Sequence, residues 1–176
     1  MQSFADQVIE LLGVSARQVP YSWEAAESAI GVGVPDDYKS LIGRTGPIIV
    51  DQWLCLFGPD SGNRNSDIAL LVQERERAWA EFREAGIELP GKYFAAGSRL
   101  LAFAAVEANY FFWHARPGVV PEDWGVVIVD ADLEEWYEPD MSATECIYRV
   151  LVGEIELDPF EDLFGGLEHR VETFPG

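Results

Sequence analysis

Apolar residues recur at helical spacing before residue 47, and each such segment begins or ends at a residue typical of a helix boundary. The first segment covers residues 4–12 and stops at Gly13. Ser22 is a candidate N-cap for a second helix that ends at Gly31, and Pro35 suits the first position of a third. The spacing therefore predicts three short helices ahead of the first strand.

The period changes after Pro47, where runs rich in β-branched and aromatic residues begin. A long helix is expected from a cap at Ser66 or Asp67 to about Gly86, and a last helix from Ser142, with Glu145 completing a capping box. The continuous apolar run at 126–129 predicts a central strand covered on both faces. The predicted strands are 48–50, 53–57, 99–103, 110–114, 125–129 and 135–137.

This order of elements indicates an α+β domain. A chain of 176 residues fits one domain over 1–176 and can bury roughly 70% of its extended surface. The core is expected at about 22–153. Residues 154–176 are acidic and contain three Gly and two Pro, so they are expected to form an irregular tail.

The charge balance is strongly acidic, with 12 Lys and Arg against 31 Asp and Glu and a net charge of −19. A field of this sign repels phosphate backbones and anionic headgroups, which argues against nucleic-acid and membrane partners. It accelerates encounter with a basic protein instead. Keeping the domain soluble is the alternative explanation, and the composition alone does not choose between the two.

The cysteines and the apolar segments bear on location. Cys55 and Cys146 lie in apolar contexts, which favours two buried thiols in a reducing compartment over the alternative of one disulfide. The first 13 residues carry acids where a signal peptide has basic residues. The apolar stretch 100–115 is interrupted at Glu107 and is too short to span a bilayer. A cytoplasmic protein is therefore expected.

Catalytic chemistry finds little support in the residues. Cys55 could pair with His114 or His169, but neither cysteine opens a glycine-bounded helix or has a basic neighbour to lower its pKa. Two histidines without an i,i+4 partner do not match common zinc patterns. Asp130 and Asp132 could hold a divalent cation, yet no glycine-rich phosphate loop accompanies them. They are expected to form a polar turn, and no catalytic residue, cofactor or metal is predicted.

Aromatic residues give a stronger indication of binding. Six Trp is many for this length, and Trp is enriched in binding hot spots. Trp53, Trp113 and Trp136 fall on predicted strands, and one or two exposed beside acids would anchor a basic partner. The acid cluster at 154–162 could also steer such a partner. The candidate partner-binding residues are Asp36, Asp37, Trp53, Glu134, Glu135 and Trp136.

Two segments resemble the SUKH superfamily, the Smi/Knr-like proteins. Residues 23–46, WEAAESAIGVGVPDDYKSLIGRTG, resemble its signature, with Val34 for the usual Leu and Thr45 for the Asn before Gly46. Residues 121–153, PEDWGVVIVDADLEEWYEPDMSATECIYRVLVG, look like the family's later half, with Gly125 for a frequent Pro and Cys146-Ile147 for an aromatic-leucine pair. Together the two segments account for most of the motifs between residues 23 and 153.

The resemblance implies an α+β fold with a mixed or antiparallel sheet flanked by helices. It also implies that Trp23, Pro35, Tyr38 and Trp124 are core or turn residues. It also implies a non-enzymatic role, because many bacterial members are immunity proteins that neutralise toxins and fungal members are regulatory scaffolds. We therefore expect an immunity protein that blocks a basic toxin of nuclease or deaminase type. A scaffold with an endogenous partner is the alternative, and a metal-dependent enzyme using Asp130 and Asp132 is a remote one.

Overall fold

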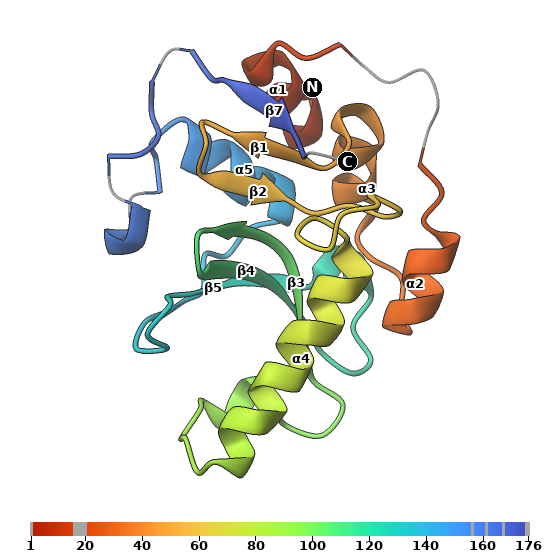
Figure 1. Cartoon of the computed structure of the whole chain (residues 1–176), viewed down its shortest axis with the longest axis vertical. Coiled ribbons are helices and arrows are strands. Elements are labelled where there is room, and N and C mark those ends of the chain that lie inside the picture. The colour runs from red at the N-terminus through yellow and green to blue at the C-terminus, as the bar shows by residue number, and fades with distance from the viewer. Residues whose placement is uncertain (1, 16–20, 156, 161, 167, 175–176) are drawn as a thin grey trace.

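A seven-stranded antiparallel sheet forms the centre of the domain, with strand order β6-β5-β4-β3-β2-β1-β7 (Figure 1). The computed structural model describes residues 2–15, 21–155, 157–160, 162–166 and 168–174. The strands are β1 (Ile48–Val50), β2 (Leu54–Leu56), β3 (Arg99–Val106), β4 (Asn109–Ala115), β5 (Gly125–Val129), β6 (Trp136–Tyr137) and β7 (Val171–Thr173). The helices are α1 (Phe4–Leu12), α2 (Glu24–Ile30), α3 (Asp36–Thr45), α4 (Ile68–Glu84) and α5 (Ala143–Leu151). The α+β expectation is confirmed, and every paired strand in the sheet is antiparallel.

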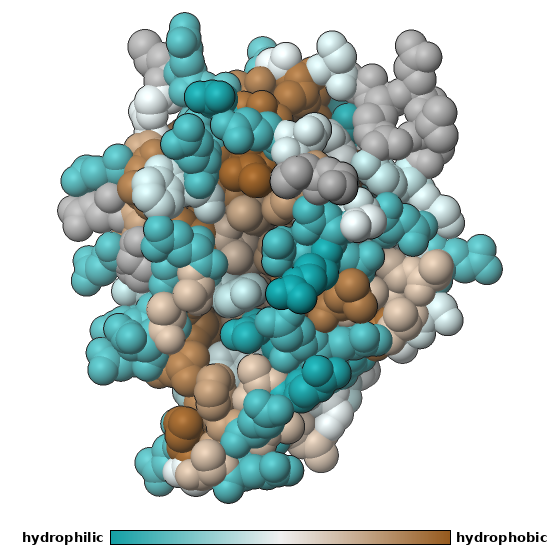
Figure 2. All heavy atoms as spheres, viewed as in Figure 1, coloured by the Kyte–Doolittle hydropathy of each residue, from teal (hydrophilic) through white to brown (hydrophobic). Residues whose placement is uncertain are grey.

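Helices cover both faces of the sheet. Successive residues of β4 point to opposite sides: Phe112 lies 5.6 Å from Trp79 of α4 between ring centres, while Trp113 lies 5.1 Å from Tyr38 of α3. Helices α1, α3 and α5 pack against one another on the α3 side. Figure 1 shows α4 as a long diagonal helix apart from that group, and Figure 2 shows hydrophilic residues along its outer ridge.

The helix ends follow from local capping. Ser3 and Asp6 form a capping box at the start of α1, and the Asp67 side chain accepts from the Leu70 N–H at the start of α4. The prediction of Ser22 as the cap of α2 is wrong. The N-cap is Trp23, whose indole cannot accept a hydrogen bond, so α2 begins without a side-chain cap.

Helix α5 begins where predicted, at Ser142, whose hydroxyl accepts from the Glu145 N–H. The Glu145 carboxylate pairs with Arg149 at 2.8 Å, one helical turn further on, and this contact replaces the return bond of the expected capping box. Pro35 was predicted at the first helical position of α3, but it is the N-cap residue, one position before the helix begins.

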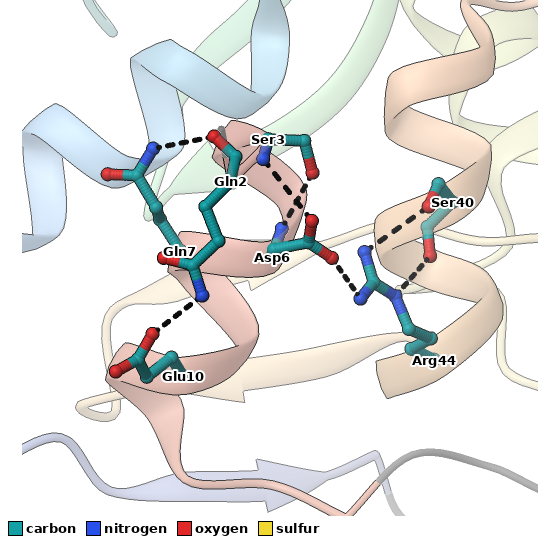
Figure 3. A network of polar contacts seen from close by, with 7 residues as sticks. All are labelled: Gln2, Ser3, Asp6, Gln7, Glu10, Ser40 and Arg44. Carbon is teal, nitrogen blue, oxygen red and sulfur yellow. Dashed lines mark hydrogen bonds and ion pairs between the residues drawn. The ribbon is translucent and has the colours of Figure 1, made fainter.

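A polar network joins α1 to α3 (Figure 3). Arg44 Nη1 donates to Asp6 Oδ1 at 2.6 Å, and the same guanidinium donates to the backbone and hydroxyl oxygens of Ser40. The hydrogen bond from Arg44, followed by that from Ser3, lowers the pKa of Asp6. The capping carboxylate of one helix therefore also serves as the docking point for the other.

Tyr38 organises the core on the α3 side. Its ring meets Trp113, Phe103 and Trp23 edge to face, and its side chain is fully buried. Its hydroxyl lies within hydrogen-bonding distance of the carbonyl oxygens of Phe57 and Phe103, where β3 has a bulge between Ala102 and Ala104. The predicted core or turn residues Trp23, Pro35, Tyr38 and Trp124 are all buried.

The position predicted for 126–129 was partly wrong. These residues are buried as expected, but β5 is the second strand from the sheet edge rather than a central one. The two-residue strand β6 forms the edge beyond it. Because the indole of Trp136 extends over β5 toward Trp79 and Tyr93, the apolar run stays covered without further strands on that side.

The segment after residue 153 is more ordered than an irregular tail. β7 pairs with β1, and Phe160 is buried with its ring stacked 5.9 Å from Phe111. At the other end of the chain, Val8 of α1 is fully buried. The core therefore extends beyond 22–153 in both directions. Of the acidic cluster at 154–162, residues 156 and 161 lie outside the described residues.

Both cysteines are free, as predicted, although Cys55 is only half-buried. Burial raises the pKa of the Cys146 thiol to about 12 and also raises that of Cys55. Neither environment activates a thiol. Across the described ranges, no helix is long and apolar enough to cross a membrane.

Candidate partner-binding surface

Three hairpin turns lie side by side at one end of the sheet. The strand pairs that close them and the pairs that connect neighbouring hairpins are Val50↔Leu54, Leu54↔Val106, Val106↔Asn109, Tyr110↔Val129 and Val129↔Trp136. Because the strand pairing is continuous from β1 to β6, turns 51–53, 107–108 and 130–135 all lie at the same end of the strands. We call these three turns together the turn face, and they lie on the left of Figure 1.

The turn face is acidic. Six of the eleven residues at 51–53, 107–108 and 130–135 are Asp or Glu, and none is Lys or Arg. The acids are Asp51, Glu107, Asp130, Asp132, Glu134 and Glu135. All of them except Asp51 and Asp130 are exposed, and Trp53 among them is 36% exposed. The surface therefore combines negative charge with an accessible aromatic ring.

Hydrogen bonds fix the shape of turn 130–135. Asp130 Oδ1 accepts from the backbone N–H groups of Glu134 at 2.8 Å and Glu135 at 3.0 Å. Trp136 Nε1 donates to the Leu133 carbonyl at 3.1 Å. The prediction that Asp130 belongs to a polar turn between two strands is confirmed, because this carboxylate holds the turn closed.

Asn109 links two of the turns. Its side chain is buried, with Nδ2 donating to the Val106 carbonyl at 2.9 Å and Oδ1 accepting from the Ala131 N–H at 3.0 Å. The first contact closes turn 107–108 and the second holds turn 130–135 beside it. The exposed acids of the two turns are therefore carried on one braced unit.

Turn 51–53 is anchored to the chain before β7. Asp51 Oδ1 accepts from the Arg170 N–H at 2.8 Å, and Asp51 Oδ2 lies 2.6 Å from His169 Nδ1. Asp51 and Gln52 adopt φ of 54° and 67°, and Glu107 adopts 55°. Such conformations cost non-glycine residues of order 1 kcal/mol or more each. The sheet and the anchor contacts therefore hold these turns in shapes that the residues alone disfavour.

The structure brings together only part of the predicted site. Trp53, Glu134 and Glu135 lie on the turn face. Trp53 belongs to the turn itself rather than to a strand, since β2 begins at Leu54. Trp136 packs inward, stacked on Tyr93 with ring centres 5.2 Å apart, so it supports the face from behind.

Asp36 and Asp37 lie elsewhere, at the N-terminus of α3 in the helical layer. The Asp37 carboxylate accepts from the Thr144 hydroxyl at 2.7 Å, and Asp36 lies 3.6 Å from the Lys39 ammonium. Both acids therefore have local partners within the fold. Their positions follow from helix capping and docking, which the favourable charge at a helix N-terminus also supports.

Glu107 and Asp132 were missed as partner-binding candidates. Glu107 stands in a two-residue gap between apolar β runs, which is the pattern of a tight hairpin. Once the hairpins are drawn in order, every second connection falls at the same end of the sheet. This alternation of connections between the two ends of the sheet would have placed Glu107 beside 130–135 from the sequence alone.

Comparison with known proteins adds no relative: no family model, curated protein or solved structure matches the chain. In the part of the chain that the structure describes, no group of three or more His, Cys, Asp or Glu side chains is arranged to hold a metal ion.

Proposed function

We propose that this domain is a non-enzymatic protein-binding module and that it acts as an immunity protein, using the turn face to bind and neutralise a basic toxin. The observation that carries the proposal is the gathering of exposed acids and the exposed ring of Trp53 on braced turns at one end of the sheet. The resemblance of residues 23–46 and 121–153 to the SUKH superfamily supports the same role.

The physical reasoning concerns what such a surface binds. Nucleases and deaminases that act on nucleic acids present basic surfaces to an anionic substrate. An acidic surface of similar extent attracts the same basic cleft and accelerates the encounter. Trp53 supplies the apolar contact area that slows dissociation, since large aromatic side chains dominate binding hot spots. Occupying the cleft would exclude the substrate without any chemistry by the domain.

The test is affinity capture from the native host with the wild-type chain, followed by activity assays on the purified partner. We expect a basic protein whose toxic activity falls to background at a stoichiometric amount of the domain. Co-expression should restore growth to cells that make the partner. A partner that keeps full activity in the complex would contradict neutralisation and would favour the scaffolding alternative.

A pair of charge-matched variants tests the surface itself. The turn-face variant carries Glu107→Gln, Asp132→Asn, Glu134→Gln and Glu135→Gln, and its control carries Glu24→Gln, Glu81→Gln, Glu84→Gln and Glu88→Gln at exposed helical or adjoining positions. Both sets remove the same formal charge. We expect association to slow several-fold in the turn-face variant and much less in the control. Equal slowing in both would show that only net charge matters.

A further inference from the structure

A small pocket of about 90 Å³ lies between α4 and the turn face. Eight of its ten lining residues carry apolar or aromatic side chains, and the other two are Arg75 and Asp130. Ala108 and Leu133 bring two of the three turns of the proposed binding surface into the lining. The turn face therefore includes part of an apolar pocket beside its exposed acids.

The apolar part of the lining is accessible from outside. Ala108 and Ala131 are exposed, and Phe82, Tyr110 and Leu133 are half-buried against the core. A group that enters the pocket therefore meets methyl groups, a branched side chain and aromatic rings. Covering these surfaces removes apolar area from water, which favours binding of another apolar group.

The volume of the pocket limits the size of the group that fills it. An apolar cavity of about 150 Å³ holds benzene, which has about six carbon atoms in its ring. At the same packing, the pocket of about 90 Å³ holds roughly three to four carbon atoms. This size matches the side chains of Val, Leu and Ile and is too small for the ring of Phe, Tyr or Trp.

Exposed acids stand beside the pocket. Glu107 directly precedes Ala108, and Asp132 lies between Ala131 and Leu133, and both acids are exposed. Because consecutive Cα atoms are about 3.8 Å apart, each of these acids lies next to a lining residue. The surroundings of the apolar pocket are therefore negatively charged.

Arg75 brings a positive charge to the lining, but this charge has local partners. Its guanidinium is held over the Tyr110 ring, 4.7 Å from the ring centre, and its Nη2 lies 3.6 Å from Glu74 Oε1. The charge of Glu74 offsets that of Arg75, so the exposed acids of the turns determine the sign of the field beside the pocket. A Lys or Arg next to the entering group is attracted by this field.

We propose that this pocket receives a Val, Leu or Ile side chain of the protein partner, and that a Lys or Arg of the partner flanks it. The partner as the source of this side chain rests on the proposed function. The turn face then has two apolar anchor points, the exposed Trp53 and the pocket, and each is surrounded by acids. Apolar anchors that fill pockets supply much of the binding energy of protein interfaces, while the surrounding charges select the partner.

The probe is 3-methylbutylammonium, because it joins the branched end of a Leu side chain to a positive charge. We would titrate it into the full chain, labelled with ¹³C at the alanine methyl groups, and follow the NMR resonances of Ala108 and Ala131. Saturable shifts are expected with a dissociation constant of about 1–100 mM, as suits a small probe. At equal ionic strength, the neutral 3-methylbutanol should bind several-fold more weakly and the anionic 3-methylbutanoate more weakly still. The larger benzylammonium should also bind several-fold more weakly than 3-methylbutylammonium.

Variants separate the pocket from the charge around it. Ala131→Leu places a larger side chain in the lining and should abolish the saturable shift at Ala108, whereas Ala85→Leu, at an exposed position outside the lining, should leave it unchanged. The turn-face variant should lose the preference for 3-methylbutylammonium over 3-methylbutanol while 3-methylbutanol still binds. No saturable shift in the wild type, tighter binding of 3-methylbutanoate or benzylammonium, or an unchanged response in Ala131→Leu would each overturn the assignment.

The captured partner tests the source of the side chain. Ala131→Leu should weaken the complex at least tenfold, mainly through faster dissociation, because the partner's side chain no longer enters the pocket. If the probes bind but Ala131→Leu leaves the complex unchanged, the assignment of the pocket to the partner is wrong. If the probes fail while the turn-face variant still slows association, the proposed function stands and the pocket inference is wrong.

Discussion

Replacing Asn109 with Ala tests whether the turn face is a braced unit. The substitution removes both side-chain hydrogen bonds, at 2.9 Å to the Val106 carbonyl and at 3.0 Å to the Ala131 N–H. At about 0.5–1.5 kcal/mol for each bond, the free energy of unfolding should fall by about 1–3 kcal/mol. For a chain of this size the melting temperature should fall by roughly 2–12 °C.

The local effect is more specific than the global one. Hydrogen exchange of the Ala131 amide should accelerate by about 2- to 13-fold, which is the loss of one such bond expressed as an equilibrium constant. Asn109→Asp keeps an oxygen that can accept from Ala131, so protection of that amide should persist although the added charge destabilises the turn. Asn65→Ala, at an exposed loop position, is the control. Unchanged exchange at Ala131 in Asn109→Ala would refute the bracing.

Four other predictions follow from the structure and from the charge of the chain. Tyr38→Phe should lower the free energy of unfolding by about 1–3 kcal/mol in urea titrations, because a buried carbonyl loses its donor while the ring stays packed; an unchanged midpoint would contradict this. Burial, followed by the charge of Arg116, lowers the pKa of His114 below 6.5, so its stabilising contribution is complete above pH 6.5 and is lost as pH falls through the folded-state pKa. His114→Gln should therefore reduce the loss of stability on acidification, and an identical pH profile would exclude this role. Asp130→Asn with Asp132→Asn should leave divalent-ion binding at the same background level as in the wild type, and micromolar binding of a divalent ion that only the wild type shows would restore the metal hypothesis. Stopped-flow association with the captured partner should slow markedly as salt rises while dissociation changes much less, and an on-rate flat in salt would assign the acidity to solubility alone.

The features that sequence predicted well depend on neighbours in the chain. Helical spacing and the glycine after it located α1, and the Asp67 cap located α4. Tyr38 was expected in the core from the resemblance of its segment to a known signature, and it is fully buried. For α1 and α4 the capping groups lie within a few residues of one another, so the local pattern contains the information. The contacts of Tyr38 are distant, with Phe103 and Trp113, and only the resemblance pointed to them.

The features that sequence missed depend on distant pairings. β7 is three residues of mixed character, and it becomes a strand only because β1 offers an open edge for it. The contact between His169 and Asp51 likewise joins positions 118 residues apart. Ser22 carried the right chemistry for a cap, but the helix began one residue later than a Ser22 cap requires. The local sequence therefore does not specify these long-range pairings or the exact first residue of a helix.

The candidate site shows the same division. Trp53, Glu134 and Glu135 were selected because acids and aromatic residues adjoin them in the sequence, and the turn face contains all three. Asp36 and Asp37 met the same criterion and belong to a helix start instead. A cluster of acids in sequence says nothing about which end of a sheet it reaches. That depends on the register of successive hairpins.

Two features of the turn face are energetically unfavourable. Four of its non-glycine residues, Asp51, Gln52, Glu107 and Leu133, adopt left-handed backbone conformations. Its acids are also gathered without a Lys or Arg in the same turns, in a chain whose net charge is already −19. Spreading the acids would serve solubility with less repulsion. Strained backbone and like charge on one braced surface support the proposal that the turn face binds a partner, because stability is often given up at binding sites for recognition.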